Sequence, residues 1–453
     1  MLRGVRHLVA VLVVIALCPL MMGLLLQRST GDLECSSYLN IMNPEYVPAD
    51  ATIEYIKEQE MLREGLTLVA DAGRLTVVRE LAGAFDSWDA TTIVTSDTPL
   101  VVGRPLIWQD PRGGTQLAAC SAGATTTSKT WYLGEGKTSD GFTTSINVLN
   151  PGETPADVNV TYITQEGAKT GAALVAPPMG AATWDAADTV SDTSSFSAVV
   201  TADVPIVAGM LLTWAGGLSS YASVGVSAVA TRWYLAEGNT GAWSGFGTSV
   251  VVANPGKDVA TVTVDCITDG ALHAGPKLTV PPLCQTKVDL ADSFPDHPQL
   301  TAVVSSDTPV VAMQTMTWSD GQGINPTMGA PRASDQWYFP AGTPTPEFST
   351  WIAVQNVGDE TAKVTVDLVT EAGIIPGPTF DVDPLGRHSL SIEDLDVDVV
   401  DFTIAITAQP PVLAQQGTYW QCGDLVHRDV NFGSPSMSDE WYLPTYPGYP
   451  MGP

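Results

Sequence analysis

Basic residues are scarce in this chain of 453 residues. Lysine and arginine together number 20, against 49 aspartates and glutamates, which gives a net charge of −29 at neutral pH. A surface of this kind repels phosphate backbones and anionic lipids, so we expect no nucleic-acid partner. It favours solubility and association with cations instead.

Residue patterns that carry out catalysis are also missing. The chain has five histidines, and the four beyond His7 are scattered. It has no paired Cys/His spacing of the kind that binds zinc and no Gly-x-Ser-x-Gly elbow. The densest acidic run, from Glu393 to Asp401, lacks the spacing of an EF-hand and indicates a solvated loop. We therefore expect no catalytic, cofactor-binding or metal-binding residues, no cofactor, and no enzymatic activity.

Cysteines are few, but four of the six form two candidate disulfides. In the first expected module, Cys35 lies at the start of the first strand and Cys120 lies near the last strand. Cys266 and Cys284 flank one strand-turn-strand segment in the third module. Both pairs could persist outside the cell. Buried free thiols are the alternative, and Cys422 has no partner in its own module.

What the chain does contain is a long internal repeat. Four Trp-Tyr pairs are separated by 102, 104 and 104 residues, a period that indicates whole domains in tandem. Three further landmarks keep the same period: an Asn, usually in Asn-Pro, an Asp-x-Pro turn that becomes Gln-x-Pro in the last copy, and a second Trp. The Asn residues are Asn43, Asn150, Asn254 and Asn356, and the turns begin at Asp97, Asp203, Asp307 and Gln409.

The phase of the repeat follows from its ends. The first copy has its Asn-Pro segment with no Trp-Tyr pair before it, and the last Trp-Tyr pair lies near Pro453. We therefore predict that each Trp-Tyr-Leu strand ends the module before it. The predicted modules span 32–134, 135–236, 237–340 and 341–444, followed by a Pro- and Tyr-rich tail at 445–453.

Within a module the apolar residues alternate with a period of two, as in residues 158–163, 261–266 and 363–368. Gly, Pro, Asp and Asn interrupt the strands about every ten residues, which is typical of a sandwich. The segment Ser-Ser-Asp-Thr-Pro at 305–309 predicts a tight connection. The expected fold is all-β, with four tandem immunoglobulin-like β-sandwich modules. Four such modules in file would reach on the order of 130 Å.

The first residues, 1–31, predict a hydrophobic helix before the modules. An uncharged run of nineteen residues from Leu8 to Leu26 is about long enough to cross a bilayer. Arg3 and Arg6 before it favour a cytoplasmic N-terminus. We expect a signal anchor that holds the protein on the extracellular face of the membrane, or a secreted protein if the segment is cleaved.

The tryptophans divide into repeated and unrepeated ones. Alternation places the repeated ones in the sandwich cores. Trp351, in contrast, takes the position of Ser249 in the previous copy, on the face opposite Ile352, and should be exposed. With Trp243 in a loop, it is a candidate ligand contact. The repeated set is Trp108, Trp131, Trp214, Trp233, Trp318, Trp337, Trp420 and Trp441.

The combination of Trp-Tyr-Leu-Ala-Glu-Gly at 233–238, the strand that ends in Asn-Pro, and the Ser-Asp-x-Pro-Val-Val segment resembles a tandem module of exported proteins in Gram-positive and related bacteria. That family is known chiefly as a domain of unknown function. Its members often have an Arg after Pro-Val-Val, which here only Arg104 matches; Met210, Gln314 and Gln416 stand in the other copies. The resemblance implies a surface protein and no active site.

We therefore expect a non-catalytic extracellular surface protein that acts as a spacer, scaffold or adhesion element. One alternative is a protein that binds cell-wall or environmental polysaccharide through Trp351 and Trp243. Another is a subunit of an envelope assembly. The expected partners are the membrane and a cell-wall glycan or surface protein.

Overall fold

The computed structural model describes residues 34–444, except 58–59, 70–71, 78–89, 110–114, 215–219, 242–244, 319–320, 322, 343–347, 396–401 and 423–424. The chain is all-β, as predicted. The expected helix at 1–31 and the tail at 445–453 lie outside the described residues. None of the helices in the described part is long and apolar enough to cross a membrane.

The strands form four units, which we number 1 to 4. Unit 1 contains β1 (Glu34–Asn43), β2 (Ala49–Lys57), β3 (Glu60–Leu68), β4 (Ala72–Val77), β5 (Thr91–Gln109) and β6 (Thr115–Ala122), with β30 (Ser438–Leu443). Unit 2 contains β7 (Ser128–Gly136), β8 (Phe142–Asn150), β9 (Ala156–Thr164), β10 (Gly167–Thr170), β11 (Leu174–Ala176), β12 (Gly180–Asp185), α3 (Ala187–Val190), β13 (Phe196–Trp214) and β14 (Ser220–Val224).

Unit 3 contains β15 (Ala230–Gly238), β16 (Gly247–Asn254), β17 (Ala260–Thr268), β18 (Ala271–His273), β19 (Lys277–Val280), β20 (Cys284–Asp289), the 3-10 helix η3 (Leu290–Asp292), β21 (Leu300–Trp318) and β22 (Gly323–Met328). Unit 4 contains β23 (Ser334–Gly342), β24 (Phe348–Gln355), β25 (Ala362–Thr370), β26 (Gly373–Val382), β27 (Arg387–Ser391), the 3-10 helix η5 (Glu393–Leu395), β28 (Phe402–Cys422) and β29 (Leu425–Phe432).

The four units share one topology. The strand order β10-β9-β13-β8-β12 of unit 2 recurs in the other three. In each unit one long strand joins two sheets: residues 197–202 of β13 pair with β9, and residues 207–214 pair with β8. Apolar side chains of both sheets fill the space between them. The β-sandwich architecture is therefore present, while the immunoglobulin-like assignment stays a prediction.

The Asp-x-Pro segments are not turns, so that prediction was wrong. They lie in the middle of the long strands, where the strand leaves one sheet for the other. Proline has no N–H to give to a ladder, so it fits this crossing. The Asp307 carboxylate accepts a hydrogen bond from the Thr261 amide, 2.8 Å away, and Asp203 accepts one from the Asp157 amide in the same way. The crossing thus keeps both sheets in contact without a reversal of the chain.

The predicted phase of the repeat was also wrong. Each Trp-Tyr strand pairs with the long strand that follows it: β7 with β13, β15 with β21, and β23 with β28. The last one, β30, returns to unit 1 and pairs with β5, where Trp441 lies opposite Val94. Alternating side chains show which face of a strand is buried but not which strand lies beside it, so the sequence pattern allowed either phase.

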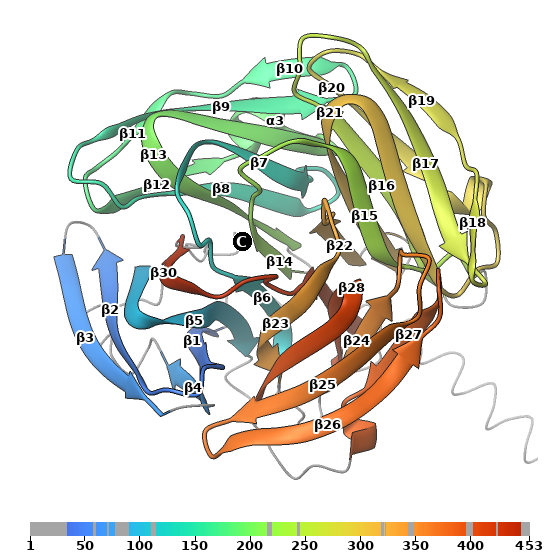
Figure 1. Cartoon of the computed structure of the whole chain (residues 1–453). Coiled ribbons are helices and arrows are strands. Elements are labelled where there is room, and N and C mark those ends of the chain that lie inside the picture. The colour runs from blue at the N-terminus through green and yellow to red at the C-terminus, as the bar shows by residue number, and fades with distance from the viewer. Residues whose placement is uncertain are drawn as a thin grey trace, which may run out of the picture.

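The return of β30 closes the units into a ring (Figure 1). Their last strands surround the centre: β6 contacts β14, β14 contacts β22, β22 contacts β29, and β29 contacts β6. The expectation of four modules in file is therefore wrong. Strand pairing between the two ends of the repeat region, supported by these contacts, holds the units in a compact ring.

The recurring Asn and Trp residues have the same role in every unit. The Asn254 side chain donates to the carbonyls of Asp258 and Val280 and accepts from the Gly256 amide, all within 3.0 Å. Equivalent bonds form at Asn43, Asn150 and Asn356. The Trp233 indole donates to the Val310 carbonyl at 3.0 Å. Trp131, Trp337 and Trp441 donate to the carbonyls of Ile206, Val412 and Leu100.

The repeated tryptophans are mostly buried. The side chains of Trp131, Trp233, Trp337 and Trp441 are buried in the unit cores, and each fills the space between two sheets. In the second set Trp318 and Trp420 are buried and Trp214 is partly exposed. The side chain of Trp108 lies outside the described residues.

The two candidate disulfides are not formed, because Cys120, Cys266 and Cys284 are free thiols. Cys35 and Cys120 lie on strands that pair with opposite edges of β5. Two strand spacings of about 4.8 Å separate them, beyond the reach of a disulfide. The strands of Cys266 and Cys284 are likewise separated in the sheet order by β21 and β16.

Candidate functional site

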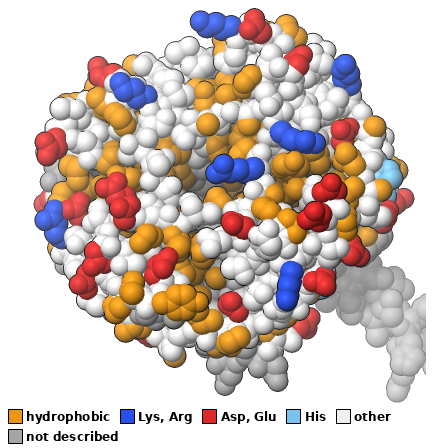
Figure 2. Space-filling model, in the orientation of Figure 1, with side chains coloured by type: hydrophobic (Ala, Val, Ile, Leu, Met, Phe, Trp, Pro, Cys, Tyr) orange, Lys and Arg blue, Asp and Glu red, His pale blue; other side chains and the backbone are white. Residues whose placement is uncertain are grey.

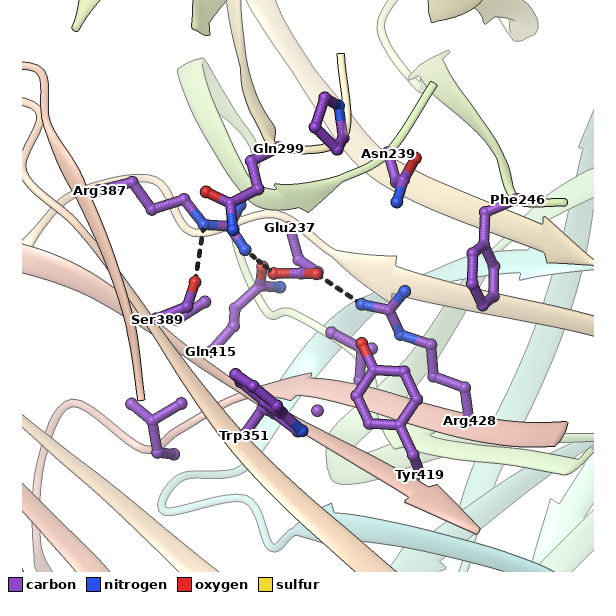
Figure 3. Close-up of a pocket in the computed structure, with 15 residues that line it drawn as sticks. Glu237, Asn239, Phe246, Gln299, Trp351, Arg387, Ser389, Gln415, Tyr419 and Arg428 are labelled. Atoms are coloured by element: carbon purple, nitrogen blue, oxygen red, sulfur yellow. Dashed lines mark hydrogen bonds and ion pairs between the residues drawn. The ribbon is translucent and has the colours of Figure 1, made fainter. Parts of the chain in front are cut away.

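A pocket of about 180 Å³ opens where unit 3 meets unit 4 (Figure 3). Unit 3 contributes strand β15 and the loops before β16 and β21, and unit 4 contributes β24, β27, β28 and β29. The lining residues are Glu237, Asn239, Phe246, Pro298, Gln299, Trp351, Ile352, Ala353, Arg387, Ser389, Gln415, Gly417, Tyr419, Arg428 and Val430.

A carboxylate between two guanidinium groups forms the floor of the pocket. Glu237 from unit 3 receives Arg387 on Oε2 and Arg428 on Oε1, the latter at 2.6 Å, and Figure 3 shows the two arginines approaching from opposite sides. Burial raises the pKa of the Glu237 carboxyl, but both arginines oppose it and hold the pKa below its usual range. Glu237 is therefore ionised at neutral pH.

Arg428 is held between two aromatic rings. Its guanidinium carbon lies 4.8 Å from the centre of the Tyr419 ring and 5.5 Å from that of Phe246. The side chain is only 3% exposed, and its Nε has no hydrogen-bond partner. A buried donor of this kind is costly to leave unbound, so the site favours a ligand that can accept from it.

The pocket also has an unbound acceptor and a second donor. The side chain of Gln415 is buried, and its Oε1 has no hydrogen-bond partner. Burial raises the pKa of the Tyr419 phenol to about 12, so its hydroxyl remains protonated and can donate. A ligand with several hydroxyl groups could satisfy both kinds of group at once.

Trp351 forms one wall of the pocket and remains 41% exposed, as the alternation on β24 predicted. The side chain of its neighbour Ile352 is completely buried. The Trp351 indole donates to Ser349 Oγ at 3.1 Å, and Glu393 accepts from the Thr350 amide at 2.7 Å. The indole is thereby fixed with part of its ring facing solvent. Trp243, the other candidate contact, lies outside the described residues.

The equivalent junction between units 2 and 3 has a different set of side chains around its glutamate. There, Glu135 stands in the place of Glu237 and is completely buried, with Lys287 on Oε1 at 2.9 Å and the Thr315 hydroxyl on Oε2. By strand register, Lys287 corresponds to Ser389 and Thr315 to Gly417. Both replacements shorten the side chain that stands beside the glutamate in the junction between units 3 and 4.

A second, smaller cavity of about 50 Å³ lies close to the centre of the ring, around Asp429. The Asp429 carboxylate accepts from the Cys120 amide at 3.0 Å, from Asn325 at 3.1 Å and from Asn431 at 3.0 Å. These partners come from units 1, 3 and 4. Burial raises the pKa of Asp429 to about 7, although the hydrogen bonds oppose the shift. The Asp429 carboxyl therefore links three units through hydrogen bonds, and it does not line the larger pocket.

Sequence reasoning found some of this site and missed the rest. It identified Trp351 from alternation alone. It did not identify Arg387, Arg428 or Tyr419, because their strands follow Glu237 by more than a hundred residues and nothing local marks them. The one available signal was Gly417, in a strand position where the preceding copy has Thr315.

The chain as a whole is acidic, whereas the pocket is not. Figure 2 shows acidic side chains scattered over one face of the ring, with few basic side chains among them. Against the net charge of −29, a site that contains two arginines and one glutamate is locally positive. The pocket therefore has the opposite sign of charge to the chain as a whole.

Comparison with known proteins gives a family match over less than half of the chain and no activity. No curated protein matches the chain. Among solved structures, Thermotoga maritima 1070 is 18% identical with a TM-score of 0.21 over 23% of this chain and 95% of that one. The Anabaena sensory rhodopsin transducer is 25% identical with a TM-score of 0.17 over 19% and 96%. A tetra-tandem repeat from the extending region of a large adhesion protein is 11% identical with a TM-score of 0.11 over 90% and 97%.

These TM-scores are too low to carry an argument about fold or function. The family match concerns the part of the chain that forms the pocket. Its segment runs from just before β15 to just after β29, so it contains both units that form the pocket. Residues 227–436 match a family of unknown function (DUF5719).

Proposed function

We propose that the protein is a non-catalytic, extracellular binding protein whose pocket between units 3 and 4 takes a sugar residue of a cell-wall or environmental polysaccharide. The observation that carries the proposal is the partly exposed Trp351 beside buried polar groups without partners, Arg428 Nε and Gln415 Oε1. A pyranose has an apolar face that an indole can cover and hydroxyl groups that both donate and accept.

The size of the pocket fits one sugar unit and not a whole chain. Its volume of about 180 Å³ is below the range of most sites for drug-sized ligands. Trp351, which lines the pocket, is also 41% exposed to solvent. A polysaccharide could therefore place one residue in the pocket and continue across the surface.

The closed ring makes binding a better proposal than a spacer. A closed ring of four units has a much shorter maximum dimension than the same units in file. Its shape therefore fits a spacer poorly. It places the pocket between two units that are in contact within the closed ring. The N-terminal hydrophobic segment would display this ring at the cell surface, and a scaffold or adhesion role would follow from polysaccharide binding.

Retention on a panel of cell-wall and environmental polysaccharides tests the proposal. Trp351→Ala removes the aromatic wall and should weaken binding by about tenfold, the loss expected for one aromatic contact. Tyr46→Ala is the matched control, because Tyr46 is 83% exposed in unit 1 and does not line the pocket. It should bind like the unchanged protein.

A second variant fills the pocket without removal of any group that lines it. Gly417→Thr introduces the side chain that stands at the equivalent position between units 2 and 3, where Thr315 binds Glu135. A Cβ atom at Gly417 would lie 3.2 Å from the Tyr419 ring, so the variant should fold with a small shift of that ring and lose binding. Retention of no polysaccharide, or equal retention by Trp351→Ala and the unchanged protein, would contradict the proposal.

A further inference from the structure

The net charge of the ion-paired side chains differs by one elementary charge between the two equivalent junctions. Between units 2 and 3, Glu135 faces Lys287, and the pair is neutral. Between units 3 and 4, Glu237 faces both Arg387 and Arg428. The lining of the pocket holds no other Asp or Glu, so it carries one positive charge that no lining group neutralises.

The two arginines are not equally engaged. Arg387 uses all three nitrogens: Nε donates to Ser389 Oγ at 3.4 Å, Nη1 to the Ala236 carbonyl at 2.8 Å, and Nη2 to Glu237. Arg428 donates through Nη2 to Glu237, while its Nε has no partner. Arg387 is therefore fixed as a partner of Glu237, and Arg428 retains donor capacity for something else.

The position of Arg428 prevents it from escaping to solvent. Its guanidinium lies between the rings of Tyr419 and Phe246, and its side chain is almost completely buried. A planar cation held in this way is preorganised to bind an anionic oxygen group, since little side-chain entropy is left to lose. The anionic group would lie in the same pocket as Trp351.

We infer that the pocket selects an acidic sugar, a residue whose carboxylate binds Arg428 while its ring lies against Trp351. This inference rests on the proposed function and narrows its ligand class. Glu237 has a positioning role: it binds both arginines, and the three groups together leave one positive charge for the ligand. Gln415 Oε1 accepts from a ring hydroxyl.

Calorimetric titration of the full chain tests the inference with matched pairs of oligosaccharides. Galacturonic acid oligomers and galactose oligomers of equal length differ in the carboxylate, and sulfated galactose oligomers add a different anion. At low salt the galacturonate oligomer should bind at least about tenfold more tightly than the neutral one, the size of one charge-assisted hydrogen-bonded contact. The preference should shrink as sodium chloride screens the charge.

Arg428→Gln should abolish the preference for the acidic oligomer over the neutral one, while Arg428→Lys should retain part of it. If Arg428→Gln does not fold, the salt dependence of the unchanged protein decides. Equal affinity for acidic and neutral oligomers at low salt would overturn the inference and leave the proposed function intact. Binding of the sulfated oligomer in preference to the galacturonate would overturn the carboxylate assignment. Binding of none of the sugars would overturn both the inference and the proposed function.

Discussion

At the scale of single residues, the repeat retains side chains that satisfy the backbone. Asn254 and its three equivalents each bind two carbonyls and one amide at a bend between strands, so no shorter or purely accepting side chain could replace them. The repeated Trp-Tyr strands retain an indole for its volume and for its single N–H. Recurrence in every unit therefore marks folding roles, and the unrepeated residues Trp351 and Gly417 mark the candidate site.

Asp429 gives a prediction for the effect of pH on stability. An unfolded aspartate has a pKa near 4, and burial raises the pKa of Asp429 to about 7. Between these values the folded protein keeps a proton that the unfolded chain has lost. The contribution of Asp429 is thus complete below about pH 4, and the free energy of unfolding should fall by up to about 4 kcal/mol as the pH rises to about 7.

Urea unfolding at several pH values measures this slope, and Asp429→Asn provides the comparison. The asparagine cannot titrate, so its variant should lose most of this fall between pH 4 and 7, whatever its absolute stability. An unchanged slope in Asp429→Asn would show that other groups cause it and that Asp429 is already ionised in the folded ring.

At the scale of strands, β30 differs from its equivalents because it is not followed along the chain by another described strand of unit 1. β7, β15 and β23 are each followed directly by a strand of the unit they join, whereas β30 comes from the other end of the repeat region. Arg104 on β5 compensates: Nη1 donates to the Pro444 carbonyl at 3.0 Å, just beyond β30, and Nη2 donates to Thr92. Met210, at the equivalent position in unit 2, has no side-chain N–H to donate in this way.

Arg104→Met should therefore loosen β30 and leave the other units in place. Removal of these buried, charged hydrogen bonds should lower the free energy of unfolding by about 2–3 kcal/mol. Hydrogen exchange should become faster at residues 438–443 and at their partners on β5. Met210→Leu is the matched control and should cost less than about 1.5 kcal/mol. Unchanged exchange in β30 would mean that its ladder alone holds it.

The sequence predicted strands better than it predicted their partners. Alternation and turn residues located the all-β units and the exposed side of Trp351. They could not show that the segment around Asp307 continues as one strand, because the crossing between sheets contains the same residue types as a turn. Nor could they pair Trp441 with Val94, which lies more than three hundred residues earlier. The arginines of the pocket were missed for the same reason.

At the scale of the whole molecule, the closed ring brings repeated units into contact, and the candidate site lies at one of these contacts. The junctions between units are equivalent in backbone, so each can diverge in its side chains while strand pairing holds the frame. At one junction Glu135 binds Lys287 and Thr315, whereas the equivalent junction has a pocket with a net positive charge. The function proposed for the protein depends on this closure, because the pocket belongs to two units and to neither alone.

Small-angle X-ray scattering on the chain without residues 1–31 tests the closed ring most directly. A compact particle of this length should have a radius of gyration of about 22 Å. Four units in file, with a length on the order of 130 Å, should give a value near ~40 Å. The ring predicts the smaller value and a symmetric distance distribution. A radius near the larger value, with a long tail in that distribution, would contradict it.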